Sequence, residues 1–131
     1  MKTSSILVID DEPHMRTLTA HTLRRGGYEN LTFARNGREG LELAGQINPD
    51  LIIMDYMMPE LNGLGALQAL KAAWQTSSIP VIMVSGCGEL HALRDPVSLG
   101  AAVVLTKPYS PMLLLEHTDN ILSTHQPTLP A

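Results

Sequence analysis

Acidic, hydroxyl and basic side chains recur in this sequence directly after short apolar segments. In chain order they are Asp10, Asp11, Glu12, Asp55, Ser85, Thr106 and Lys107. Taken singly, each has an ordinary structural explanation, such as a helix N-cap for the aspartates before Pro13 or a solvated surface charge for Lys107. If the apolar segments are parallel strands, however, their carboxyl ends meet at one edge and these side chains converge. Carboxylates gathered in one crevice repel each other, a cost that makes sense only if a cation sits among them.

The nature of that cation follows from the ligand atoms. Oxygen-only ligands favour a hard ion, and a small site that leaves room for waters and a phosphate suits magnesium better than calcium. With magnesium in place, Asp55 can act as a carboxylate nucleophile and form an acyl phosphate. Lys107 supplies a point charge for the phosphate oxygens, and Ser85 supplies a hydroxyl donor. Phosphoryl transfer needs mainly positioning and charge neutralisation, which this set provides without an added base.

The apolar segments themselves predict the fold. Five short segments of β type alternate with longer, helix-like ones: Ile6 to Ile9, Leu31 to Ala34, Leu51 to Met54, Val81 to Val84, and Val103 to Leu105. Four of these five read as continuous apolar runs, which is typical of parallel strands covered by helices on both faces. We therefore expect the α/β class, with a doubly wound, flavodoxin-like (βα)5 sandwich and a five-stranded parallel sheet in the order 2-1-3-4-5.

The intervening segments carry side chains at helical spacing. One stripe holds Met15, Leu18, Thr19, Thr22 and Leu23, and another holds Leu64, Leu67, Leu70 and Trp74. Gly26-Gly27 is expected to close the first helix and Asn36-Gly37 to open the second. A last helix is expected from about Pro111 to Leu122. The chain should therefore form one domain over residues 1–122, with residues 123–131 as a C-terminal tail or the start of a linker.

The bulk properties exclude several classes of protein. With 131 residues, 44% hydrophobic and 17% charged, the chain has the size of one compact domain with its own core. A net charge of -4 gives no basic field to attract DNA or RNA, so no direct nucleic-acid ligand is expected. A single cysteine, apolar runs too short for a membrane helix and the lack of a signal-peptide pattern predict a cytoplasmic protein.

Four motifs, in their order and spacing, resemble the receiver domain of bacterial two-component response regulators. They are Ile6-Leu7-Val8-Ile9-Asp10-Asp11-Glu12-Pro13, then Asp55-Tyr56-Met57-Met58-Pro59-Glu60-Leu61-Asn62-Gly63, then Val84-Ser85-Gly86, then Gly100-Ala101 leading to Leu105-Thr106-Lys107-Pro108-Tyr109. Any one motif is weak evidence, but the set is specific and covers residues from about 4 to 122.

The resemblance implies a role for each matching residue. Asp55 is the phosphoacceptor, and Asp11 and Asp55 bind Mg²⁺ directly while Asp10 acts mostly through water. The backbone carbonyl of Met57 completes the protein ligands, and Pro108 usually follows a cis peptide bond. The implied partners are a sensor histidine kinase or a histidine phosphotransfer protein as donor, and a downstream effector or output domain as receiver of the signal. Such a chain assists its own phosphorylation and dephosphorylation but is not a stand-alone enzyme.

The sequence departs from the family pattern at two places. Many receivers carry a Tyr or Phe where this chain has Val104, and that ring turns inward after phosphorylation; valine has no ring to swing. In the fourth helix, expected after Ser85, Gly86 and Gly88 loosen the start and Pro96 interrupts the interior at a cost of up to about 3 kcal/mol. An early helix end and a functional hinge are both open interpretations of Pro96.

The last helix carries more apolar side chains than one stripe can bury, namely Met112, Leu113, Leu114 and Leu115. A partner or homodimer face formed by the fourth helix, fifth strand and fifth helix is one interpretation, and ordinary exposed leucines are the other.

Three other functions compete with a phosphorylated receiver. A phosphatase of the haloacid dehalogenase type needs a second Asp two residues after its nucleophile, where this chain has Met57. A flavodoxin-like electron carrier needs a first loop that cradles a phosphate, which Asp10-Asp11-Glu12 would repel. The nearest alternative is a phosphorylation-independent interaction scaffold on the receiver fold, for which Val104 and Pro96 leave room.

Overall fold

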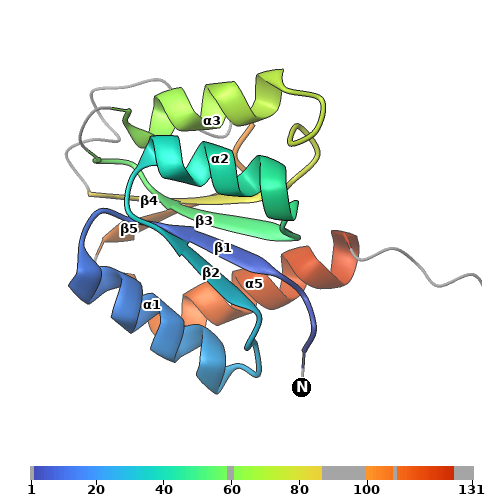
Figure 1. The fold of residues 1–131 in the computed structure, drawn as a ribbon. Coiled ribbons are helices and arrows are strands. Elements are labelled where there is room, and N and C mark those ends of the chain that lie inside the picture. The colour runs from blue at the N-terminus through green and yellow to red at the C-terminus, as the bar shows by residue number, and fades with distance from the viewer. Residues whose placement is uncertain (1, 59–60, 87–99, 108, 126–131) are drawn as a thin grey trace, which may run out of the picture.

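The computed structural model describes residues 2–58, 61–86, 100–107 and 109–125. In chain order its elements are β1 (Ile6–Ile9), α1 (Pro13–Arg25), β2 (Leu31–Ala34), α2 (Gly37–Ile47), β3 (Leu51–Asp55), α3 (Gly63–Ala72), β4 (Val81–Gly86), β5 (Val103–Lys107) and α5 (Pro111–His125). The strands form one parallel sheet in the order β2-β1-β3-β4-β5. Helices α2 and α3 cover one face of this sheet, and α1 and α5 cover the other (Figure 1). The predicted doubly wound fold and strand order are confirmed.

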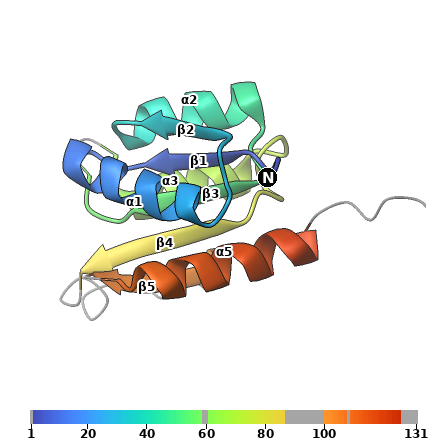
Figure 2. The ribbon, with the colours of Figure 1, turned by 90° about the horizontal axis from the view of Figure 1, so that it is seen from below.

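Three strands extend beyond their predicted apolar segments at the carboxyl end. Asp55 is the last residue of β3, Ser85 lies within β4, and Lys107 ends β5. Figure 2 shows the arrowheads of β1, β2, β4 and β5 at the same end of the molecule. The polar residues singled out in the sequence are therefore held by strand hydrogen bonds at that end, and their backbone positions are fixed by the sheet.

The core has two layers because successive strand side chains point to opposite faces. Ile6 and Val8 pack with Leu114 on the side of α1 and α5, whereas Leu7 and Ile9 pack on the side of α2 and α3. All five side chains are buried. Burial of each Leu, Ile or Val contributes about 1.5–3 kcal/mol, so this sandwich gives the strand ends a rigid base.

Two helices begin with a side-chain cap. Asn36 accepts a 2.8 Å hydrogen bond from the amide of Glu39 at the start of α2, and Asn62 accepts one from the amide of Gly65 at the start of α3. Helix α1 differs, since its N-cap residue Glu12 makes no side-chain cap. The first turn of α1 therefore depends on other contacts near the carboxyl edge of the sheet.

Trp74 was expected on the buried stripe of the third helix, and this expectation is wrong. Helix α3 ends at Ala72, and the side chain of Trp74 is 82% exposed. Two hydrogen bonds hold the turn that follows: Thr76 Oγ1 donates to the carbonyl of Leu70 at 2.7 Å, and Lys71 Nζ donates to the carbonyl of Ile79 at 2.7 Å. The first bond satisfies the carbonyl of Leu70, which one more helical turn would have used, and the second ties the end of the turn back to α3.

The last helix runs to His125, beyond the predicted end at Leu122. Ile121 and Leu122 are buried in the same layer as Leu114 and anchor the last described turns of the helix on the core. The described part of the chain contains no helix with the length and apolar character of a membrane span. The expected fourth helix with Pro96 and the peptide bond before Pro108 lie outside the described residues.

Gly63 and Gly45 offer a matched pair of substitutions. A Cβ at Gly63 would lie 2.5 Å from the carbonyl oxygen of Asp55 and 2.7 Å from Cα of Tyr56, whereas one at Gly45 would have no neighbour within 4 Å. We expect Gly63→Ala to lower the free energy of unfolding by roughly 1–3 kcal/mol because backbone must shift. Gly45→Ala should raise it by about 0.4–1 kcal/mol. Urea unfolding measures both, and equal stability of the two variants would contradict the close approach at Gly63.

Candidate functional site

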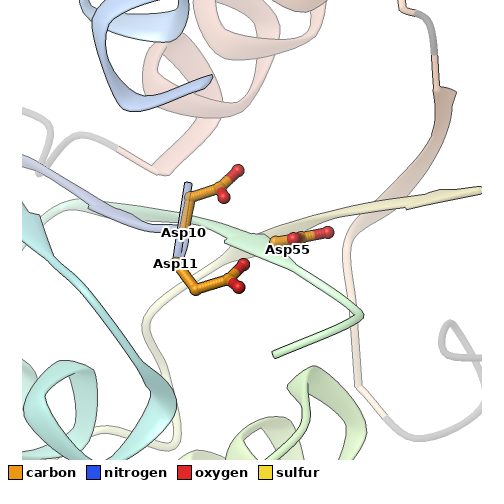
Figure 3. Close-up of side chains that lie close together, drawn as sticks. All are labelled: Asp10, Asp11 and Asp55. Atoms are coloured by element: carbon orange, nitrogen blue, oxygen red, sulfur yellow. The ribbon is translucent and has the colours of Figure 1, made fainter. Parts of the chain in front are cut away.

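Three carboxylates converge at the carboxyl edge of the sheet. Asp10 and Asp11 directly follow β1, and Asp55 ends the neighbouring strand β3. The close-up shows the side chains of Asp11 and Asp55 directed toward the same space, with Asp10 beside them (Figure 3). One carboxylate oxygen from each residue lies within 4.8 Å of the others. The convergence expected from the sequence is thus present.

Lys107 supplies a positive charge to this cluster from the end of β5. Its Nζ lies 3.0 Å from Oδ1 of Asp55, and the side chains are 25% and 3% exposed respectively. Burial lowers the pKa of Lys107, but the hydrogen bond and charge of Asp55 outweigh it, so the pKa is raised overall. Lys107 therefore keeps its proton, and the pair is a buried carboxylate beside a permanent cation.

The positive charge of Lys107 does not fully offset the burial of Asp55. Burial raises the pKa of Asp55, the hydrogen bond and charge of Lys107 lower it, and the charge of Asp11 raises it again. The net shift is upward. A backbone hydrogen bond from Met57, two residues beyond β3, also favours the ionised form. A further positive charge nearby would favour the ionised form of this carboxylate.

Asp10 likewise lacks enough nearby positive charge to stabilise its ionised form, and its pKa is strongly raised. Its side chain is buried, and its Oδ1 accepts a 2.9 Å hydrogen bond from the amide of Glu12. Burial is the largest cause that raises the pKa of Asp10 to about 6, and the charges of Asp55 and Asp11 add to it. The amide of Glu12 and the charge of Lys107 act in the opposite direction.

Asp11 provides the observation that points most directly to a ligand. Its Oδ1 is buried and has no hydrogen-bond partner among the described residues. An orphaned buried carboxylate oxygen costs free energy unless an ion or a water binds it. Three carboxylates within reach of one point, with oxygen donors alone, fit a hard divalent cation such as Mg²⁺.

Ser85 lies one strand away from Asp55, fully buried in β4. Its Oγ lies 3.2 Å from the carbonyl oxygen of Gly86, to which it donates. Met57 is largely exposed in the segment after β3, next to the carboxylate cluster in sequence. The structure thus puts both residues in or beside the site, and the roles given to the hydroxyl of Ser85 and the carbonyl of Met57 stay predictions.

Sequence reasoning assigned no role to two contacts that hold the site from helix α1. Arg16 donates from its guanidinium to the backbone carbonyl of Asp10 at 2.7 Å. The buried hydroxyl of Thr19 lies 2.6 Å from the hydroxyl of Tyr109, two residues after Lys107. Burial raises the pKa of Tyr109, so the phenol stays protonated. Helix α1 therefore contacts both the segment that carries Asp10 and the segment that follows Lys107.

Val104, at the position where an aromatic switch was considered, is half-buried in β5. It packs against the core layer under α2 and α3. Tyr109, another described residue near the site, packs instead in the opposite core layer with α1 and α5.

Comparisons with known proteins agree with this geometry. The sequence model of the response regulator receiver domain family matches residues 6–119. The DNA-binding dual master transcriptional regulator RpaA of Synechocystis is 37% identical over 123 residues, which span 88% of this chain and 51% of that protein. The chemotaxis protein CheY1 of Helicobacter pylori is 32% identical over 121 residues, which span 92% of this chain and 98% of that protein.

A solved structure is also similar throughout its length. The signal receiver domain of a signal transduction histidine kinase from Syntrophus aciditrophicus superposes with a TM-score of 0.83 at 31% identity, covering 98% of this chain and 97% of that one. The chain spans about half the length of the transcriptional regulators among its curated relatives.

The raised pKa of Asp10 predicts how stability depends on pH. In the unfolded chain this carboxyl has a pKa near 3.8, and in the folded, metal-free protein it has one of about 6. At pH values between these two pKa values, the folded state therefore binds more protons than the unfolded state. The stability that Asp10 contributes at low pH is lost as pH rises through about 6. Asp10→Asn removes this loss while keeping an oxygen that accepts from Glu12. At pH 7.5 without metal, we expect the variant to be more stable by roughly 1–3 kcal/mol.

The measurement is urea unfolding in EDTA at pH 7.5 and pH 4, with the exposed Glu42→Gln as control. The gain of Asp10→Asn should shrink at pH 4, and Glu42→Gln should show little change at either pH. A destabilised Asp10→Asn at pH 7.5 would contradict the proposed charge shortage.

Proposed function

This chain belongs to the response regulator receiver domain family, and from that premise we propose that it is a phosphorylation switch in which Asp55 accepts a phosphoryl group. The observation that supports this most is the ion pair of the buried Asp55 with Lys107, beside two further aspartates. A lysine that holds its proton favours the ionised, nucleophilic form of Asp55 and offsets part of the effect of burial. We further propose that the chain is not a stand-alone enzyme but assists its own phosphorylation and dephosphorylation.

In the proposed reaction an oxygen of Asp55 attacks phosphorus in a phosphohistidine of a sensor kinase or phosphotransfer protein. The new oxygen–phosphorus bond forms as the phosphorus–nitrogen bond breaks, and the imidazole leaves with the electron pair and takes up a proton. After the transfer, Lys107 can contact the phosphoryl oxygens as well as the carboxyl group of Asp55. The hydroxyl of Ser85, one strand away, donates to a phosphoryl oxygen.

A bound Mg²⁺ would supply the positive charge that the site lacks and would neutralise phosphoryl oxygens during transfer. Asp11 and Asp55 are its proposed direct ligands, together with the backbone carbonyl of Met57, and Asp10 acts mostly through water. The orphaned oxygen of Asp11 and the raised pKa of Asp10 both support a cation at this place.

The proposed partners are a histidine kinase or phosphotransfer protein on one side and an effector or output domain on the other, in the cytoplasm.

A homodimer is a further candidate, since Met112 is 81% exposed and Leu113 is 41% exposed at the start of α5. If this face dimerises, sedimentation velocity in beryllofluoride and Mg²⁺ should detect a dimer that Met112→Lys abolishes. A monomer in both proteins would count against it.

One observation favours a second candidate function, a scaffold that binds partners independently of phosphorylation. Val104 is packed into the core and has no ring that could reorient after phosphorylation. The two candidates differ in whether phosphorylation changes the affinity of the chain for any partner.

The phosphoacceptor chemistry is tested by intact mass after incubation with acetyl phosphate and MgCl₂. We expect the wild type to gain one phosphoryl group, and we expect the gain to vanish with EDTA and in Asp55→Ala. Glu42→Gln, which removes an exposed carboxylate on α2, should behave as the wild type. No gain in the wild type, or an equal gain in Asp55→Ala, would reject the assignment.

A further inference from the structure

The backbone carbonyl of Asp10 has an unusual partner. The parallel pairing of β1 with β2 runs from Ile6 and Leu31 to Ile9 and Ala34. The amide of Asp10 still follows this ladder and donates to the carbonyl of Ala34 at 3.1 Å. The strand pairing ends at Ile9 and Ala34, and Asn36, whose amide would donate to the carbonyl of Asp10 in this register, is already the N-cap of α2. The carbonyl of Asp10 thus lies where β2 has turned away.

Arg16 takes the place of the missing strand. Its guanidinium donates to that carbonyl at 2.7 Å, across six residues of sequence, from the first turns of α1. The carbonyl belongs to the peptide unit that joins Asp10 to Asp11. A planar peptide held at its oxygen has a fixed orientation, so the hydrogen bond from Arg16 sets the directions in which the two neighbouring side chains leave the backbone.

The position of Arg16 is electrostatically unfavourable for the helix itself. A cation near a helix N-terminus opposes the helix dipole by about 0.3–1 kcal/mol, and the first turn of α1 holds no acidic residue. Arg24 and Arg25, by contrast, lie in the last turn, where the dipole favours them. An arginine at the wrong end of α1 therefore requires a local reason.

An ion pair with the carboxylate cluster does not provide that reason. The ion pairs among the described residues join Lys2 to Asp119, Arg35 to Glu39 and Lys107 to Asp55. Arg16 is in none of them, and its guanidinium contacts a neutral backbone oxygen near the site.

We propose that Arg16 is a positioning residue for the metal site, which holds the Asp10–Asp11 peptide so that both carboxylates face the cation. The inference rests on the proposed function, since it assumes that a divalent cation binds there. Residues that orient metal ligands without touching the metal typically change affinity by 10–100-fold when replaced. The proposal assigns such a role to the side chain of Arg16.

The sign of the effect separates positioning from simple charge. Removal of a nearby positive charge should by itself make a cation bind more tightly. Loss of ligand orientation should make it bind more weakly. We therefore expect Arg16→Met to weaken Mg²⁺ binding about tenfold, and Arg16→Lys, which restores a donor and the charge, to recover part of the affinity.

The test is titration of the ¹⁵N-labelled protein with MgCl₂, followed by amide chemical shifts. Arg24→Met is the matched control, because Arg24 lines the same surface groove beside Phe33 but lies at the other end of α1. Its Mg²⁺ affinity should stay within about twofold of the wild type. Urea unfolding in EDTA gives the metal-free stability of each variant.

Each result decides the proposal. Weaker binding in Arg16→Met with partial rescue in Arg16→Lys supports it. Unchanged or tighter binding overturns it, even if metal-free stability falls, because Arg16 would then be structural only. If Arg16→Met does not fold, Arg16→Gln must bind Mg²⁺ more weakly than Arg16→Lys, and equal affinities overturn the proposal. A wild type that binds no Mg²⁺ rejects the proposed function together with this inference, whereas binding with an unaffected Arg16→Met rejects the inference alone.

Discussion

Burying a carboxylate at the end of a central strand costs free energy that nearby positive charge must offset. The structure supplies only part of that charge. Asp55 has one cationic partner at 3.0 Å, Lys107, but shares its surroundings with Asp10 and Asp11. The pKa of Asp55 and that of Asp10 are both raised, mainly by burial. The folded chain thus holds a surplus of negative charge in a place that binding of a cation would relieve.

The rest of the fold holds that surplus in place. The buried strands β1 and β3 lie side by side, so the ends that carry the three aspartates cannot separate without disrupting the core. Gly63 lets the backbone of α3 approach Asp55 closely, and Arg16 and Thr19 connect α1 to the neighbouring segments. The packing of the sandwich therefore stabilises a cluster of carboxylates that is itself unfavourable, as is common at functional sites.

Much of this arrangement could be predicted from the sequence because it depends on local pattern and strand direction. Continuous apolar runs marked the strands, and residues after parallel strands had to meet at one edge. The continuation of the third helix to Trp74 was predicted wrongly, because the side chain of Thr76 satisfies the carbonyl of Leu70 through a hydrogen bond that periodicity does not reveal. The contact of Arg16 was missed because its acceptor is a backbone atom, and the pair of Thr19 with Tyr109 because 90 residues separate them.

The central claim is that Asp55, the buried carboxylate at the end of β3, is the nucleophile. The most direct measurement is to reduce the phosphorylated protein with borohydride, which converts an aspartyl phosphate to homoserine, and to locate the modified residue by peptide mass spectrometry. The account predicts homoserine at position 55 and unmodified aspartate at positions 10 and 11. Modification at Asp10 or Asp11, or phosphate that resists reduction because it is on a hydroxyl, would contradict it.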